Sequence, residues 1–389
     1  MACAFAVRGL HGYRRRHSGP GSGAMRDGQI RFFESFDGAK IAYCVSGEGP
    51  PVILLPSWLT HLEFQRRSVA WKPWLEALSS RYSLVRYDPR GCGMSDRRVD
   101  DLTFVAWVRD LDALVGHLKL DSFSLIGVCQ GGAVALEYAA RHPGRVSHLV
   151  LFGTYARGRN KRDDIPLEPE KARVMLDMVR LGWGSEDHAF ATAFAQQFQP
   201  DGAPGHLATW CELQRRAASP EVAARLTEYM FRIDIRTALT VIGCPTLVAH
   251  ATGDAVVPLA EGRLLAQSIH GAQFLELDTP NHFPRDDEPA WRSFVEVLHD
   301  FLPAPALDDA RFGDLTARER EVLDLVAAGL DNRAIAGRLG ISPKTVRNHV
   351  SGLIAALGVK SRAEAIVMAR DAGFGRGDSV NRDRRPGHG

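Results

Sequence analysis

Three side chains that could together perform nucleophilic catalysis occur in a fixed order along this chain. The first is Cys129, in Gly127-Val-Cys-Gln-Gly131, a G-x-nucleophile-x-G pattern that ends the apolar run Phe123–Val128. This pattern predicts a sharp strand-to-helix turn, because its glycines leave room for a strained backbone and the helix N-terminus favours negative charge on the nucleophile. The sequence therefore predicts a thiol nucleophile at position 129, where serine is usual.

An acid and a histidine follow Cys129 in the chain. Asp254 comes shortly after the apolar run Thr246–His250, and His282 shortly after Gln273–Leu277. If both runs are parallel strands, both side chains lie in loops at the carboxyl ends of strands, where such sheets place their sites. Asp254 would then orient His282, and His282 would take the proton from the thiol. Taken singly, a cysteine is usually a packed thiol and a loop histidine a surface group, but the order and places of all three favour catalysis.

Backbone amides are predicted to complete the site. The N–H of Gln130 is one oxyanion donor, and the loop after the predicted strand Val52–Leu55 supplies the other, for which Trp58 is the best candidate. The six cysteines, at positions 3, 44, 92, 129, 211 and 244, contain no CxxC pair and are predicted to be reduced thiols of a cytoplasmic protein. We expect neither a metal nor a cofactor.

The elements that must position these residues follow a βαβ pattern. Short apolar runs alternate with helical stretches over residues 30–155 and 236–303, which predicts a largely parallel sheet. The predicted strands are Val52–Leu55, Tyr82–Tyr87, Phe123–Val128, Val146–Phe152, Thr246–His250 and Gln273–Leu277. Residues 157–235 lack strand runs and contain amphipathic helices, such as Lys171–Leu181 and Glu221–Arg232, so we expect a helical cap there. We expect a linker at 304–311, since Pro303 and Pro305 precede two acids.

A second, all-helical module is predicted over residues 312–373. Helix N-caps are expected at Thr316, with Glu319 completing a capping box, and at Asp331, Ser342 and Ser361. The tight turn from Gly340 to Ser342 joins a short helix to a longer one with a polar, partly basic N-terminal half. This is the helix-turn-helix arrangement that reads the major groove of DNA, although a small helical bundle with a solvated face would share the bare spacing. The DNA-contacting candidates are Lys344, Thr345, Val346, Arg347, Asn348, His349 and Ser351.

The residues of this module resemble the LuxR-type DNA-binding domain nearly from end to end. The matching pieces are Leu315-Thr316-x-Arg318-Glu319-x-Glu321-Val322-Leu323, Asn332 with Ile335-Ala336, Ser342-x-Lys344-Thr345-Val346-x-x-His349, and Leu357-x-Val359-x-Ser361-Arg362. The resemblance implies that Lys344, Thr345 and His349 lie near the phosphate backbone and that Arg347, Asn348 and Ser351 face bases. It also implies a fourth helix that contributes to a homodimer on double-stranded DNA.

Residues 30–303 resemble the α/β-hydrolase fold superfamily. Besides the Cys129, Asp254 and His282 triad, the supporting pieces are Asp88-Pro-Arg-Gly91-Cys-Gly93-Met-Ser95 and Tyr138-Ala-Ala-Arg-His-Pro143-x-Arg145-Val146. The resemblance is greatest to hydrolase-type domains attached to bacterial regulators. Cysteine replaces serine, as in dienelactone-hydrolase-like members, and Pro56-Ser57 stands where a His-Gly pair is common.

Charge and composition agree with a two-part protein. The chain has a net charge of +2, but residues 27–310 carry −8 and the flanking segments are basic, which suits a body joined to a part that meets a polyanion. The ends, residues 1–29 and 374–389, are predicted to be disordered. No apolar run approaches the roughly 18 residues of a transmembrane helix, so no membrane partner is expected.

Three functions are compatible with these features. The first is a sequence-specific regulator whose hydrolase-like domain senses, captures or slowly hydrolyses a small apolar ligand, as tryptophans 58, 71, 74, 183 and 210 near the predicted pocket suggest. The second is a thiol-dependent esterase, lactonase or thioesterase with a regulatory DNA-binding appendage. The third is an interaction protein with an inactive hydrolase scaffold, which the intact triad disfavours.

Overall fold

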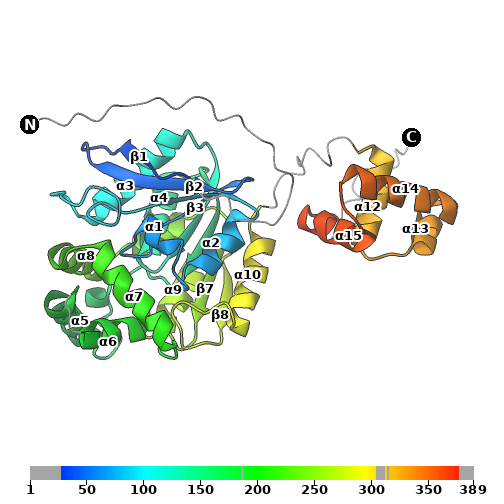
Figure 1. Cartoon of the computed structure of the whole chain (residues 1–389). Helices are drawn as coiled ribbons and strands as arrows, with labels where there is room; N and C mark the ends of the chain where they lie inside the picture. Colours follow the sequence, from blue (N-terminus) through cyan, green and yellow to red (C-terminus); the bar gives the residue numbers. More distant parts are fainter. Residues whose placement is uncertain (1–27, 185–187, 304–311, 313–314, 376–389) are drawn as a thin grey trace, which may run out of the picture.

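The computed structural model describes residues 28–184, 188–303, 312 and 315–375 (Figure 1). The predicted linker 304–311 and most of the two predicted disordered ends lie outside the described residues. Each of the two parts of the chain has its own hydrophobic core.

One eight-stranded sheet forms the centre of the larger part. Its strands are β1 (Arg31–Glu34), β2 (Lys40–Ser46), β3 (Pro51–Leu54), β4 (Ser83–Tyr87), β5 (Phe123–Val128), β6 (Val146–Phe152), β7 (Thr246–Ala251) and β8 (Gln273–Leu277), in the order β1-β2-β4-β3-β5-β6-β7-β8. The six strands from β3 to β8 are parallel, whereas β1 and β2 are antiparallel additions at one edge. All six predicted strands are present with ends within one residue of the prediction. The sequence analysis missed β1 and β2.

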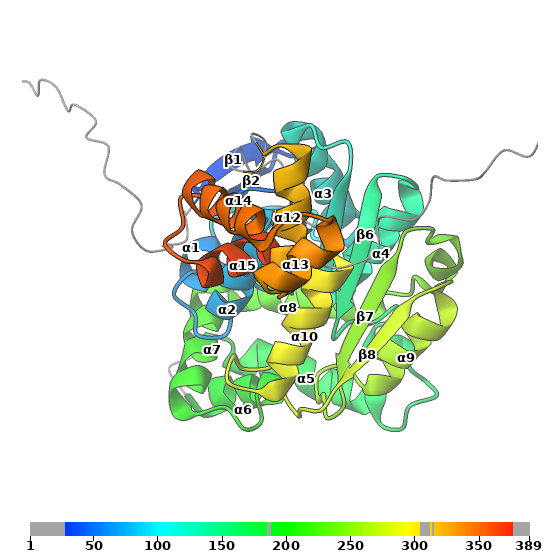
Figure 2. The ribbon, with the colours of Figure 1, turned by 90° about the vertical axis from the view of Figure 1, so that its right-hand side faces the viewer.

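Helices cover both faces of this sheet. They are α1 (Leu62–Gln65), α2 (Lys72–Ser79), α3 (Phe104–Leu118), α4 (Gln130–Arg141), α9 (Leu259–Ser268) and α10 (Pro289–Phe301), with short 3-10 turns η1 (Arg159–Lys161) and η2 (Arg236–Val241). Figure 2 shows α2 and α10 side by side, and Trp74 of α2 packs on Trp291 of α10 with ring centroids 5.2 Å apart. In the other layer, α3 packs against α4, while α4 and α9 both contact η2.

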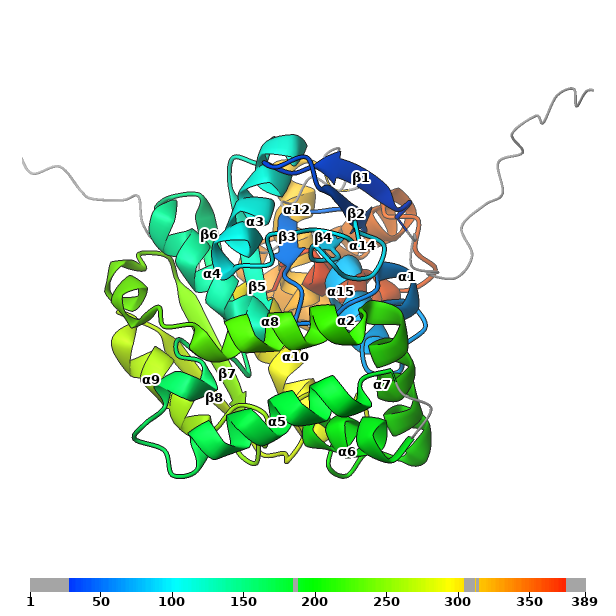
Figure 3. The same ribbon diagram turned by 90° about the vertical axis from the view of Figure 1, so that its left-hand side faces the viewer.

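A cap of four helices is inserted between β6 and β7. Its members are α5 (Glu168–Gly182), α6 (His188–Phe198), α7 (Pro204–Ala217) and α8 (Pro220–Arg232), which lie together in Figure 3. The predicted cap helices fall within α5 and α8. The cap contacts the loop that follows β8, because the amide of Phe283 donates to the carbonyl of Phe198 at 3.4 Å and the rings of Trp210 and Phe283 lie 5.2 Å apart. The cap therefore covers the end of the sheet where parallel strands finish.

The C-terminal helices are α12 (Ala317–Ala327), α13 (Asn332–Leu339), α14 (Pro343–Ala356) and α15 (Arg362–Asp371), and they have a hydrophobic core of their own. The four predicted N-caps all accept hydrogen bonds from backbone amides, and Thr316 and Glu319 form the complete capping box. Gly340 ends α13 in the left-handed conformation, with φ of 64°, which makes the tight turn into α14 possible. Phe374, one residue beyond the predicted module, is buried against Phe312.

Candidate active site and DNA-binding helix

Cys129 lies at the turn between β5 and α4, where the backbone is strained. Its φ of 51° and ψ of −123° are unusual for a residue other than glycine, and such strain is typical of a nucleophile elbow. A Cβ atom on Gly127 would lie 2.4 Å from the Cα of Gly132, so the sharp turn requires glycine at this position. The hydroxyl of Thr154 donates to the Cys129 carbonyl and helps to hold the turn. The local sequence thus directs the thiol out of the end of the sheet.

Asp254 and His282 form a short hydrogen bond beside the elbow. The Nδ1 atom of His282 lies 2.6 Å from Oδ2 of Asp254, and the other oxygen of Asp254 accepts from the amides of Val256 and Val257 at 2.8 and 2.9 Å. Burial alone would raise the pKa of Asp254, but the charge and hydrogen bond of His282 outweigh it, so the pKa lies below its usual value. Asp254 is therefore an ionised carboxylate that orients the imidazole.

The same arrangement favours a proton on His282. Complete burial lowers its pKa, but the charges of Asp254 and of a Cys129 thiolate, with hydrogen bonds to both, outweigh burial and raise the pKa to about 10. Among the described residues, Nε2 makes no hydrogen bond of ordinary geometry, although it lies near enough to the sulfur for this electrostatic effect. The three predicted residues are thus brought together at one end of the sheet, with the protonated imidazole of His282 between the Asp254 carboxylate and the Cys129 sulfur.

A second buried histidine supports the acid. His250, at the end of β7, donates from Nε2 to the Val257 carbonyl at 2.9 Å, and the same nitrogen lies 3.6 Å from Asp254. Burial lowers the pKa of His250, so this ring is neutral and positions the loop that carries Asp254. The sequence analysis did not single out His250, because it reads as the last residue of an apolar strand.

The predicted oxyanion donors lie at the site but are not open to a substrate oxygen in this structure. The N–H of Gln130 donates to the carbonyl of Ser57 at 3.2 Å. Because the Ser57–Trp58 peptide is trans, the N–H of Trp58 points opposite to that carbonyl and away from Gln130. The contact between the two loops is close, since a Cβ on Gly131 would lie 2.6 Å from the carbonyl oxygen of Pro56.

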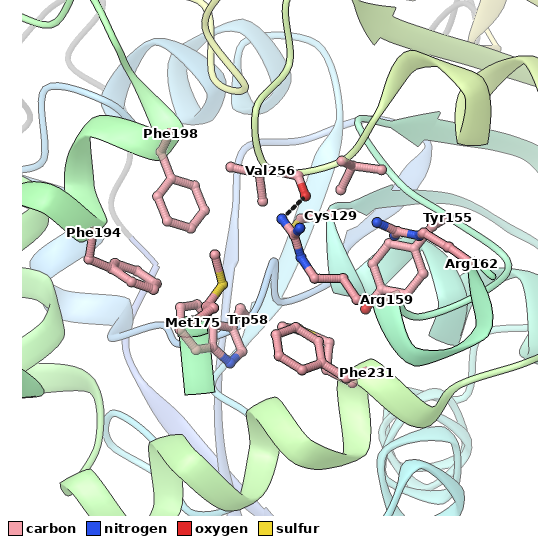
Figure 4. A pocket seen from close by; sticks show the side chains of 12 residues that line it. Trp58, Cys129, Tyr155, Arg159, Arg162, Met175, Phe194, Phe198, Phe231 and Val256 are labelled. Atoms are coloured by element: carbon pink, nitrogen blue, oxygen red, sulfur yellow. Dashed lines mark hydrogen bonds between the residues drawn. The ribbon is translucent and has the colours of Figure 1, made fainter. Parts of the chain in front are cut away.

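A cavity with about 430 Å³ between its lining atoms separates Cys129 from the cap. Figure 4 shows Phe194 and Phe198 on one side of Cys129 and Tyr155 and Arg162 on the other. The lining residues are Trp58, Cys129, Tyr155, Arg159, Arg162, Met175, Phe194, Phe198, Met230, Phe231, Val256 and Val257. A neighbouring cavity of about 370 Å³ is lined in part by the predicted Trp58, Trp183 and Trp210. Trp71 instead packs on Phe283, in the loop before α10, and Trp74 packs on Trp291 of α10.

The polar part of this lining was not predicted from the sequence. Arg159 and Arg162 belong to the run Arg157-Gly-Arg-Asn-Lys-Arg162, which begins five residues after the end of β6 at Phe152. A basic run is usually a solvated face, so the run by itself did not predict that these two arginines are buried. The position of this run after a strand that ends at the site was the one sequence feature that could have indicated its place in the cavity lining.

Six of the seven DNA-contacting candidates lie on the accessible side of α14. Lys344, Thr345, Arg347, Asn348 and Ser351 are exposed and His349 is half-buried. Val346 is fully buried in the core of the module, so its inclusion was wrong: it positions the helix and cannot contact DNA. Elsewhere in the module, Arg362 at the start of α15 donates to the Asn332 side chain at 2.8 Å and to the Leu330 carbonyl at 2.6 Å, which ties α15 to the start of α13.

A parallel sheet with a nucleophile after β5, an acid after β7, a histidine after β8 and a helical cap defines the α/β-hydrolase class. Residues 50–189 match the family model for the alpha/beta hydrolase fold, and residues 314–369 match the model for bacterial regulatory proteins of the luxR family. The chain therefore joins an α/β-hydrolase domain to a C-terminal LuxR-family helix-turn-helix domain, which supports a role in transcription regulation.

The hydrolase domain of this chain is similar to known hydrolases at moderate sequence identity. Pyrrolizixenacetamide deacetylase of Xenorhabdus hominickii is 26% identical over 264 residues, which cover 68% of this chain and 95% of the deacetylase. The solved enol-lactonase from Burkholderia xenovorans LB400 is 27% identical with a TM-score of 0.58, covering 70% of this chain and 99% of its own. An esterase from Exiguobacterium antarcticum shares the fold, with a TM-score of 0.60 and 24% identity, over 69% of this chain and 98% of its own.

No helix among the described residues is long and apolar enough to cross a membrane. Within the same residues, no group of three or more histidine, cysteine, aspartate or glutamate side chains could hold a metal ion.

Proposed function

We propose that this protein is a DNA-binding transcription regulator whose hydrolase-fold pocket binds a small ligand and reacts with it at Cys129. One observation carries the proposal: Cys129 faces a charged His282 beneath a cap, while the Gln130 amide that should stabilise an oxyanion is occupied by Ser57. A site with a reactive thiol and an unformed oxyanion hole is better suited to capture than to rapid turnover. The LuxR-family domain gives such a capture a regulatory output.

The chemistry of capture follows from the positions of the two side chains. The Cys129 thiolate attacks a carbonyl carbon of an ester or lactone, a sulfur–carbon bond forms, and the carbonyl π pair moves to oxygen. When this intermediate collapses, the bond to the alcohol oxygen breaks and His282 gives its Nε2 proton to the departing oxygen. The product is a thioester on Cys129 and an alcohol. Release of the acyl group then needs water, with neutral His282 as base and an open oxyanion hole.

A second candidate function is a thiol-dependent hydrolase with a DNA-binding appendage. It is favoured by relatives whose names are those of a deacetylase and an enol-lactonase. Both functions use the same three residues, Cys129, Asp254 and His282, and they differ in whether the thioester accumulates.

The DNA-binding surface is assigned to the exposed face of α14. Lys344, Thr345 and His349 would lie near phosphates, and Arg347, Asn348 and Ser351 would face base edges. A homodimer would place two such helices in successive major grooves, as half-sites one helical turn apart require.

The proposed DNA function is tested by selection from random duplexes. The full chain is incubated with a library of short duplexes, and bound molecules are amplified and sequenced. We expect a shared sequence motif that Arg347→Ala weakens or changes, whereas the control Arg173→Ala, on the exposed side of the cap helix α5, leaves it unaltered. Recovery of no enriched motif, with and without ester or lactone ligands, would overturn the regulator in favour of the hydrolase.

A further inference from the structure

Two buried arginines form one wall of the cavity that contains Cys129. Arg159 is 5% exposed and Arg162 is 1% exposed, and both side chains line the cavity (Figure 4). Such burial of a guanidinium is costly unless anions compensate it. The anions around these two residues therefore decide what the wall can bind.

One carboxylate serves both guanidinium groups. Glu168 accepts from Nη1 of Arg159 at 3.1 Å and from Nη1 of Arg162 at 3.0 Å, and it also lies 3.5 Å from Nζ of Lys171. The other buried acid in the cluster, Glu261, is 2.9 Å from Nε of Arg157 but 3.8 Å from Arg162. Arg157 also pairs with Asp164 at 2.7 Å. Among the described residues, Arg159 has Glu168 as its one carboxylate partner and shares it with Arg162.

Several hydrogen-bond donors in this wall have no acceptor among the described residues. Arg159 uses Nη1 for Glu168 and one hydrogen of Nη2 for the Val256 carbonyl at 2.7 Å, so among the described residues its Nε–H and second Nη2–H have no partner. Tyr155 is 3% exposed, and its hydroxyl is buried without a partner among those residues. An unpartnered buried hydroxyl in a cavity lining is rare in folded proteins, and a ligand would satisfy it.

The rest of the cavity is apolar. Phe194 and Phe198 lie across Cys129 from Tyr155 and Arg162 in Figure 4, and Trp58 packs on Phe194 with ring centroids 5.2 Å apart. The nucleophile therefore lies between a cationic, donor-rich wall and an aromatic wall. A ligand that fills this space must be amphiphilic.

We infer that the pocket recognises a small monocarboxylate with an apolar body, whose carboxylate is held by Arg159 and Tyr155 and whose body lies along the aromatic wall. A planar carboxylate suits the guanidinium edge of Arg159, whose one carboxylate partner among the described residues, Glu168, is shared with Arg162. This assignment deepens the proposed function and rests on it for the location of the reacting group at Cys129. It also departs from the small apolar ligand that the sequence predicted, because the proposed ligand carries a charged group.

The test uses binding without reaction, so that it is independent of capture at Cys129. Binding of 4-phenylbutyrate and of its uncharged amide, 4-phenylbutanamide, is measured by calorimetry on the full-length protein. We expect the carboxylate to bind about tenfold or more tightly than the amide, because pairing with a buried charge is worth more than a neutral contact. Equal affinities, or preferential binding of phenyl phosphate over the carboxylate, would overturn the inference.

Three variants test which residues cause the preference for the carboxylate over the amide. Tyr155→Phe removes only a hydroxyl with no protein partner, so the fold is kept, and we expect it to lower the carboxylate affinity several-fold. Arg159→Gln should abolish the preference over the amide, while Lys161→Gln, an exposed neighbour on the same η1 turn, should retain it. A full preference in both Tyr155→Phe and Arg159→Gln would contradict the assignment. Failure of the proposed function would instead be seen as an unreactive Cys129 in a protein that still prefers the carboxylate.

Discussion

The backbone N–H of Gln130 donates a hydrogen bond to the carbonyl oxygen of Ser57 at 3.2 Å. This contact joins the first residue after the nucleophile to the loop that should supply the second oxyanion donor. Rotation of the Ser57–Trp58 peptide would free the Gln130 amide and turn the Trp58 amide toward the substrate in one movement, because the two ends of a peptide plane move together. The state of this single peptide thus separates a capturing site from a hydrolytic one.

A substitution that lets the Ser57–Trp58 peptide rotate more easily should raise the rate of ester hydrolysis. Ser57→Gly widens the range of ψ at position 57, so the peptide can rotate more easily. We expect hydrolysis of 4-nitrophenyl acetate to rise about tenfold, a fraction of the roughly 10²–10³ that a single oxyanion donor contributes in hydrolases. The hydrolysis rate is measured as the steady-state release of nitrophenolate. The control is Ser80→Gly, at the end of α2. An unchanged rate in Ser57→Gly would show that this contact does not limit the reaction.

Cys129 should be the most reactive thiol of the folded protein. We expect iodoacetamide to alkylate it faster than Cys44 or Cys211, which are buried without a partner imidazole, as followed by peptide mass spectrometry. His282→Ala should remove the difference, whereas His270→Ala, at an exposed position in the turn after α9, should preserve it. Equal rates at the three thiols of the wild-type protein would remove the case for an activated nucleophile.

His282 should make stability depend on pH in the alkaline range. Its pKa of about 10 in the folded protein exceeds the ordinary value of 6.5, so the folded state holds the proton more tightly than the unfolded chain. The resulting stabilisation is complete below about pH 6.5 and is lost as the pH rises through 10, at about 1.4 kcal/mol per unit of pKa difference. All seven tryptophans lie within residues 58–291, so their fluorescence in urea reports on this domain.

The comparison variant for this titration is His282→Gln. We expect its free energy of unfolding to fall less between pH 6.5 and pH 10 than that of the wild type, since lysines and tyrosines titrate in both proteins alike. The same decline in both would mean that His282 carries no raised pKa.

Lys344 and Arg347 should affect DNA binding in different ways. Lys344→Ala should weaken binding to all duplexes about equally and reduce the salt dependence by the release of about one counterion. Arg347→Ala should cost about 1–3 kcal/mol on the selected duplex alone. Fluorescence anisotropy at several salt concentrations measures both effects. A uniform loss from Arg347→Ala would place that side chain on the backbone and not on a base.

Features that depend on the residue pattern within one strand or one helix could be predicted from the sequence. The orientation of an individual side chain or peptide could not. The buried parallel strands have continuous apolar runs, so their ends were predicted to within a residue. Strand β1 buries only Phe33 among its four residues and leaves Phe32 exposed, which gives no such run. Cys129, Asp254 and His282 could be predicted because each follows a strand, and strand ends meet at one edge of a parallel sheet.

Other features depend on contacts between distant segments. Val346 is different, because the 3.6-residue period of its own helix already places it with Val350 and Leu353 in the core, where the structure has it. Arg159 and Arg162 are buried by the cap, whose Glu168 pairs with both. The direction of the Ser57 carbonyl is one rotation of one peptide, and no spacing of residue types determines it.

Capture of a ligand by Cys129 can be detected by mass spectrometry of the protein purified from its own cells. We expect an added mass on the peptide that contains Cys129, released by hydroxylamine as a thioester should be, and absent from Cys129→Ser and from His282→Ala. Cys244→Ser, which changes a half-buried thiol, should carry the adduct unchanged. An unmodified Cys129 in the wild-type protein, both as purified and after incubation with carboxylate-bearing esters or lactones, would show that this thiol captures no ligand.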